Sequence, residues 1–237
     1  MKQDGILVMN KPQGISSFGF LKQVQRKLGL KKVGHLGTLD PAACGVLVLL
    51  CGKYTKRADE LSQGQKVYQS VFTFGIETDT LDLEGKTVAT SEIIPSIEQI
   101  NNVLPSLVGD IEIEVPKFSA VHIGGRRAYD LARAGIDFTP PKRIINIERF
   151  DLLQPSGIPK FFNFQLSASH FFEVQCQTGT YIRSLAKLMA QKLGTVAIAS
   201  LIIRTRVGQF AIQDAKTLDD VTAQDLVELG QQESMLG

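Results

Sequence analysis

The sequence has few of the residues that mark disulfide-rich or zinc-binding proteins. Its 237 residues include only three cysteines, at positions 44, 51 and 176, and these form no CxxC pair. An odd number of cysteines at this spacing predicts neither a disulfide framework nor a zinc cluster. The three histidines are scattered and form no HExxH motif, so we expect no structural metal.

Long apolar runs are also missing. The longest, residues 6–9 and 46–51, are far too short to span a bilayer, and no signal-like apolar segment follows a charged N-terminus. We therefore expect a cytoplasmic protein without membrane contact. The sequence contains no P-loop, GxGxxG or GxSxG motif, and "DTLDLEG" lacks the ligand spacing of a calcium loop.

What the chain does have is a hydrophobic content of 43% and a segregated charge. Its net charge is only +2, but the segments 1–66, 67–115, 116–210 and 211–237 carry +7, −8, +8 and −5 in turn. Such blocks can build a basic face that attracts a polyanion even on a nearly neutral protein. The alternative is an ordinary solvated surface, because blocks in sequence need not cluster in space.

Hydrophobic periodicity predicts an α+β protein, most simply one domain. Helices are expected from Ser16 or Ser17 to Gly29, over 96–108, over 126–134, from a Thr180 cap over 181–193, and in an acidic tail from Thr217. Strands are expected at residues 5–10, 45–51, 66–74, 144–153, 161–168, 171–177, 197–204 and 207–212.

The stretch "GHLGTLDPAACGVL", residues 34–47, places polar groups directly before a buried strand. Pro41 restricts Asp40 to an extended or turn conformation, and the glycines let the backbone approach a ligand closely. Asp40 on such a loop can act as nucleophile, base or metal ligand, or simply form an Asx turn or helix cap. The combination of His35, Thr38 and Asp40 within six residues favours the functional interpretation.

Three further side chains are candidates for chemistry. Arg183 lies in the first turn of a predicted helix, where the helix dipole disfavours a cation, so an anion such as Asp40 or an RNA phosphate is expected nearby. An exposed, screened arginine is the alternative. Tyr68 can stack on a base or accept a proton, or belong to the core. His35 taken alone is more typical of a satisfied loop histidine than of a catalytic residue.

The segment "GGRRAYDLARAG" combines flexible glycines with Arg126, Arg127 and Arg133 around Tyr129. This composition suits contact with a nucleic-acid backbone. A plain amphipathic helix is the alternative interpretation.

Taken together, these segments resemble the TruB family of tRNA pseudouridine synthases, which isomerise the T-loop uridine at tRNA position 55. The resemblance runs in order from "GILVMNKPQGISS" through "GHLGTLDPAACGVL", "VPKFSAVHIGGRRAYDLARAG" and "GTYIRSLA" to "LIIRTRVGQF". It implies the pseudouridine synthase fold, a long mixed and mostly antiparallel sheet flanked by helices and loops, with a central active cleft. It implies no cofactor and no metal.

The resemblance also implies a role for each candidate. Asp40 would be the catalytic aspartate, Tyr68 would pack on the target base and take part in proton removal, and Arg183 would pair with Asp40. His35 would help to extrude the base, and Leu201 would pack beneath the site. The other RNA-binding candidates are Lys11, Arg126, Arg127, Tyr129, Arg133 and Tyr181.

The same resemblance divides the chain into a catalytic domain and a tail. Residues 1–210 would form the catalytic domain, in which residues 115–137 are the insertion that clamps the T-arm. Residues 211–237 would form a short acidic tail, where many bacterial relatives carry an RNA-binding PUA domain.

We therefore interpret the sequence as a monomeric isomerase that acts on the T-arm of tRNA. The main alternative is a tRNA-binding or chaperoning module whose chemistry is secondary or lost, and a phosphotransferase lacks the phosphate loop it needs. Intact Asp40, Tyr68 and Arg183 favour the enzyme, because binding a polyanion requires no carboxylate. Whether the aspartate attacks the sugar, attacks the base or assists elimination stays open.

Overall fold

The computed structural model describes residues 3–154 and 168–228. The chain forms two compact units, residues 1–69 with 202–237 and residues 70–201. The strands β4 (Lys66–Phe74) and β12 (Ala197–Val207) contribute to both units, because the division falls within them. Almost all of the strand predicted at 161–168, and the turn before it, lie outside the described residues.

The first unit is built around the buried strand β3 (Cys44–Cys51). It pairs antiparallel with β1 (Gly5–Lys11) and with β2 (Val33–Leu36), and parallel with the end of β12. All but the first of its residues are buried, as the unbroken apolar run predicted. The short β13 (Phe210–Ala211) pairs with the end of β12.

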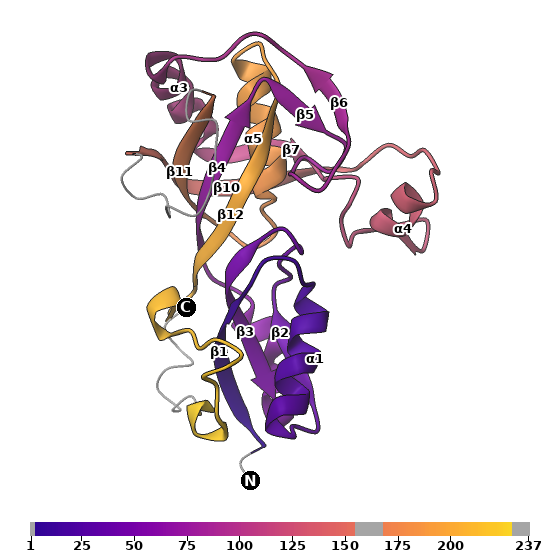
Figure 1. Cartoon of the computed structure of the whole chain (residues 1–237), viewed down its shortest axis with the longest axis vertical. Helices are drawn as coiled ribbons and strands as arrows, with labels where there is room; N and C mark the ends of the chain where they lie inside the picture. The colour runs from indigo at the N-terminus through magenta and orange to yellow at the C-terminus, as the bar shows by residue number, and fades with distance from the viewer. Residues whose placement is uncertain (1–2, 155–167, 229–237) are drawn as a thin grey trace. The chain divides into compact units, whose positions relative to one another are not determined.

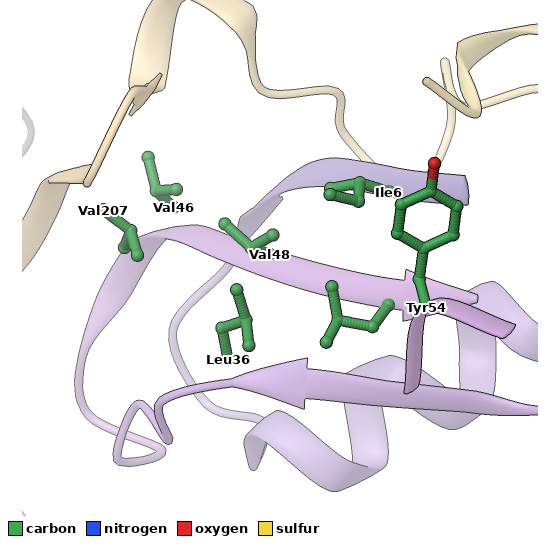
Figure 2. Packing of buried hydrophobic residues seen from close by; sticks show 7 residues of the cluster. Ile6, Leu36, Val46, Val48, Tyr54 and Val207 are labelled. Carbon is green, nitrogen blue, oxygen red and sulfur yellow. The ribbon is translucent and has the colours of Figure 1, made fainter. Parts of the chain in front are cut away.

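Helix α1 (Ser17–Leu28) follows β1 and lies beside the strands of this unit (Figure 1). The side chain of Ser16 caps it by accepting a hydrogen bond from the Gly19 amide at 3.0 Å, and Gly29 ends it with a φ of +62°. Both predicted ends are thus confirmed. Side chains of these strands pack together with Tyr54, which follows β3, into the cluster shown in Figure 2: Ile6, Leu36, Val46, Val48, Leu50, Tyr54 and Val207.

After β3 the chain forms a 3-10 helix, η1 (Gly52–Arg57), and a single turn of helix, α2 (Ala58–Leu61). The helix predicted from Thr217 is wrong for the described tail residues, which form only the 3-10 turns η4 (Ile212–Asp214) and η5 (Ala223–Asp225). The tail instead gives its backbone to the free edge of β1: Ile6 exchanges two hydrogen bonds with Val227, of 2.8 and 3.0 Å. Pairing at an open strand edge satisfies groups that a tail helix would have left unpaired.

The second unit holds strands in the order β12-β4-β11-β10-β7. Strand β10 (Lys142–Leu153) pairs antiparallel with β11 (Ser169–Cys176) and with β7 (Gly109–Glu114). Its core includes three aromatic rings in mutual contact, with centroids 4.8 to 6.1 Å apart: Phe72, Phe150 and Phe172. The mixed, mostly antiparallel α+β class predicted from the sequence is confirmed.

Helices and hairpins complete this unit. Strands β5 (Ile76–Thr78) and β6 (Thr87–Thr90) form a hairpin with an acidic turn. Within the helix predicted over 96–108, α3 (Ile97–Val103) passes into the 3-10 helix η2 (Leu104–Leu107) near Pro105. Helix α5 (Ile182–Lys192) follows β11. No helix in residues 3–154 or 168–228 is long and apolar enough to cross a membrane.

The segment expected to clamp RNA contains β8 (His122–Ile123), β9 (Arg126–Arg127) and α4 (Ala128–Arg133). Helix α4 therefore begins two residues later than the helix predicted over 126–134. Arg126 and Arg127 are not helical because they pair with β8 across a turn of two glycines. Figure 1 shows α4 projecting away from the strands of its unit.

Candidate active site

The loop that carries Asp40 is held through its backbone on both sides of that residue. Ser17, buried on α1, donates its hydroxyl to the Leu39 carbonyl and accepts from the Leu39 amide, both at 2.8 Å. The Gly14 amide donates to the Pro41 carbonyl at 2.9 Å, and the Ala43 amide donates to the carbonyl of Asp40 at 3.1 Å. The helix-cap interpretation of Asp40 is wrong, because a turn leads directly into β3.

Arg204, on β12, holds the two ends of the same loop. Its side chain is buried, with only 1% of the residue exposed. It donates from Nη2 to the Gly37 carbonyl at 3.0 Å, from Nη1 to the Thr38 carbonyl at 3.4 Å and from Nε to the Val46 carbonyl at 2.8 Å. The sequence prediction missed Arg204, although a cation within the apolar strand "LIIRTRV" was a signal for it.

Gly37 of this loop lies close to two buried cations. Its φ is +66°, and an added Cβ would lie 3.3 Å from the Lys66 ammonium and 3.4 Å from Nη1 of Arg204. A side chain here would be strained by the backbone conformation and would crowd both charges. The glycine at position 37 therefore has both a conformational and a steric reason.

His35 lies in β2, opposite Leu49 of β3, and not in a loop. Its Nδ1 is buried and has no hydrogen-bond partner among the described residues. Burial, followed by the positive charge of Arg204, lowers the pKa of His35. The interpretation as a satisfied loop histidine is wrong, and the imidazole is neutral at pH 7.

Acidification is expected to destabilise the folded protein through this histidine. The folded-state pKa of His35 lies below its unfolded value of about 6.5. Above that pH, protonation of His35 does not change the free energy of unfolding. As the pH falls toward the folded-state pKa, the unfolded chain binds the proton first and the folded protein loses stability. His35→Gln should lose less stability than wild type between about pH 7.5 and about pH 5.5, measured by urea unfolding. Burial also lowers the pKa of His170. Because His170 is present in both proteins, its effect on stability cancels in the comparison. Equal losses would contradict the prediction.

Two more predicted site residues belong to the first unit. Tyr68 lies near the start of β4 and is 7% exposed, as expected both for a core tyrosine and for one in a closed site. Lys11, at the end of β1, is fully buried and donates to the carbonyls of Pro12 at 2.8 Å and Ile15 at 2.7 Å. It closes the turn before α1, and its RNA-binding role stays a prediction.

Arg183 belongs to the second unit and is 3% exposed, so the interpretation as an exposed arginine is wrong. It donates to the Thr80 carbonyl at 2.6 Å and the Phe118 carbonyl at 3.0 Å, and its Nε lies 3.8 Å from the buried carboxylate of Asp82. Asp82 is thus one anion near Arg183, as the sequence predicted. Pairing of Arg183 with Asp40 stays a prediction.

The start of α5 differs in one detail from the sequence prediction. Tyr181, and not Thr180, occupies the N-cap, and it makes no side-chain cap bond. The Thr180 hydroxyl donates instead to the Gln177 carbonyl at 2.9 Å. Leu201 is buried in β12, where its carbonyl accepts a hydrogen bond from the Ser70 hydroxyl. Tyr181 and Leu201 both lie within residues 70–201, the second unit.

The clamp segment presents cations beside aromatic rings at the surface. The guanidinium of Arg133 lies 5.5 Å from the centre of the Tyr129 ring. Arg126 and Arg127 are exposed on β9, and Arg127 also donates to the Ala120 carbonyl at 2.8 Å. This arrangement of exposed cations and a half-buried ring suits contact with phosphates and unstacked bases.

The fold is similar to those of chains in solved structures of multi-component complexes. The chain aligns with a subunit of a Cbf5–Nop10–Gar1 complex at a TM-score of 0.68 and 26% identity, covering 92% of this chain and 53% of that one. The fold is also shared, at a TM-score of 0.66 and 24% identity, with a chain of an H/ACA ribonucleoprotein bound to a substrate RNA containing 2'-deoxyuridine. This chain spans about half the length of the chain that it matches in each of these two structures.

Sequence relatives extend over more of the chain. A protein named tRNA pseudouridine synthase B from Geobacillus kaustophilus is 40% identical over 92% of this chain and 76% of its own length. One of the same name from Borrelia garinii is 39% identical over 96% and 78%. The profile described as TruB family pseudouridylate synthase (N terminal domain) matches residues 25–182.

The fold and these matches define a pseudouridine synthase, which is an isomerase. Within that class, the chain belongs to the TruB family.

Proposed function

We propose that this protein isomerises the T-loop uridine at position 55 of tRNA to pseudouridine, without a cofactor. The observation that carries the proposal is the GTLDP loop. The side chains of Ser17 on α1 and Arg204 on β12 bond to the backbone before Asp40, and the Gly14 amide bonds to the Pro41 carbonyl after it. The relatives named tRNA pseudouridine synthase B support tRNA as the substrate.

The reaction sets the chemical requirements of the site. The bond from N1 of the base to C1′ of the ribose breaks, the base turns, and C5 bonds to the same C1′. The proton on C5 leaves and N1 gains one, so the product is an isomer of the substrate. A fixed carboxylate can act covalently or stabilise positive charge that develops at the sugar.

We assign the carboxylate to Asp40 and leave open whether it attacks the sugar, attacks the base or assists elimination. A base is needed late in the reaction to remove the C5 proton, and Tyr68 and Asp40 itself are the candidates. Arg183 would pair with Asp40 as its counterion. The resemblance of the matching segments to the family supports these roles.

The target uridine must also leave its stack, which costs a few kcal/mol. His35 would enter the space left by the base, while Tyr68 and Leu201 would pack around it. Lys11, Tyr181 and the basic clamp segment would bind the surrounding RNA through its shape and backbone.

We also propose that the enzyme works as a cytoplasmic monomer, because one chain carries Asp40, Tyr68 and Arg183 and its proposed substrate is tRNA. Analytical ultracentrifugation with and without tRNA tests the stoichiometry.

Release of tritium from a tRNA transcript labelled at C5 of uridine tests the activity. We expect one tritium released per tRNA with wild-type protein, and none from a transcript whose T-loop target is cytidine. Binding of the first transcript without release would favour the alternative of a tRNA-binding module.

Removing a clamp cation should weaken RNA binding and reduce its dependence on salt. For Arg133→Ala we expect about a threefold to tenfold weaker Kd, and a slope of log Kd against log salt smaller by somewhat under one, as for one lost phosphate contact. Arg149→Ala is the matched control, because Arg149 is already paired with Asp151 and Glu173. An unchanged Kd and slope for Arg133→Ala would remove this residue from the RNA interface.

A further inference from the structure

One buried guanidinium connects the start and the end of the Asp40 loop. Arg204 bonds to the carbonyls of Gly37 and Thr38 before the aspartate and to the carbonyl of Val46 after it. The backbone of Arg204 is itself fixed, because it pairs with Gly45 in the parallel ladder of β12 and β3. The loop is thus closed against a strand that is part of the core.

This arrangement needs an arginine. A guanidinium donates several hydrogen bonds in a fixed plane, whereas a lysine ammonium is a point donor on a flexible stem. Lysine at position 204 would keep the charge but could not serve three carbonyls in these directions. A buried carbonyl left without a donor destabilises the folded protein, so the loop would shift to recover a partner.

We propose that Arg204 is a positioning residue for the isomerisation, which sets the direction of the Asp40 carboxylate without contacting the RNA. The proposal rests on the proposed function. A displacement of a reacting group by about 1 Å can lower a rate about a hundredfold. Ser17 holds Leu39 from another element, so a loosened loop would stay near its place in a folded protein.

Arg204→Lys tests this role through a separation of binding from chemistry. We expect a single-turnover rate constant about tenfold to a hundredfold below wild type at saturating protein, with the Kd for tRNA within about threefold. The rate constant at saturation does not depend on the fraction of folded protein, so a purely structural role would leave it unchanged. Arg206→Lys, the same change at an exposed position of the same strand, should match wild type.

Thermal unfolding shows whether Arg204→Lys is folded under the assay conditions, and Arg204→Gln provides a second variant for the same test. Arg204→Gln should be slower still than Arg204→Lys, because it loses the charge as well. A rate for Arg204→Lys within about twofold of wild type, or failure of both variants to fold at low temperature, would overturn the proposal. Absence of turnover by wild-type protein in the same assay would instead refute the proposed function.

Discussion

Asp40→Asn is expected to abolish turnover while tRNA binding persists. The substitution keeps the shape of the side chain and removes the charge on which both covalent attack and stabilisation of the sugar depend. We expect the single-turnover rate to fall at least about a thousandfold, while the Kd changes by no more than about tenfold, or ~1.4 kcal/mol. Tritium release and filter binding on the same preparations measure the two quantities.

Asp59→Asn is the matched control, because it makes the same change at an exposed position in the first unit. Its rate should equal that of wild type. Turnover retained by Asp40→Asn would mean that another group performs the chemistry.

Gly45→Ala is expected to have the largest effect on stability. Gly45 has a φ of +102°, and an added Cβ would lie 2.9 Å from the backbone nitrogen of Arg204 and closer still to its carbonyl oxygen. These are backbone atoms of a paired strand and cannot turn aside. We expect a loss of at least about 3 kcal/mol in the free energy of unfolding, measured with urea.

The control separates backbone strain from the clash. Gly109 has a φ of +90° and nothing within 4 Å of an added Cβ. Gly109→Ala should therefore cost only about 1–2 kcal/mol, the penalty for a positive φ alone. Similar losses for both variants would show that the contact with Arg204 is not decisive.

The sequence predicted those parts of the fold that depend on local rules. The ends of α1 followed from a serine cap and a C-terminal glycine, and the burial of β3 followed from an unbroken apolar run. The helix expected from Thr217 failed because the tail pairs with the open edge of β1, a partner distant in sequence. Strand β2 was missed because its four residues are too few to show a clear alternation of apolar and polar side chains.

The candidate site shows the same division between local and distant information. The motif identified Asp40 and His35 as candidates, because glycines, a proline and polar groups lie close together there. The bonds of Arg183 to Thr80 and Phe118 join positions 103 and 65 residues away, so no local pattern predicts them. The sequence signals Arg204 only as a cation within an apolar strand, and its partners could not be predicted because they lie about 160 residues earlier.

The most direct test of the central claim is to map pseudouridine at single-nucleotide resolution in an unmodified tRNA transcript treated with the protein. We expect one pseudouridine, at the T-loop position 55, with wild-type protein and none with Asp40→Asn. A transcript without pseudouridine, or one modified equally by both proteins, would contradict it.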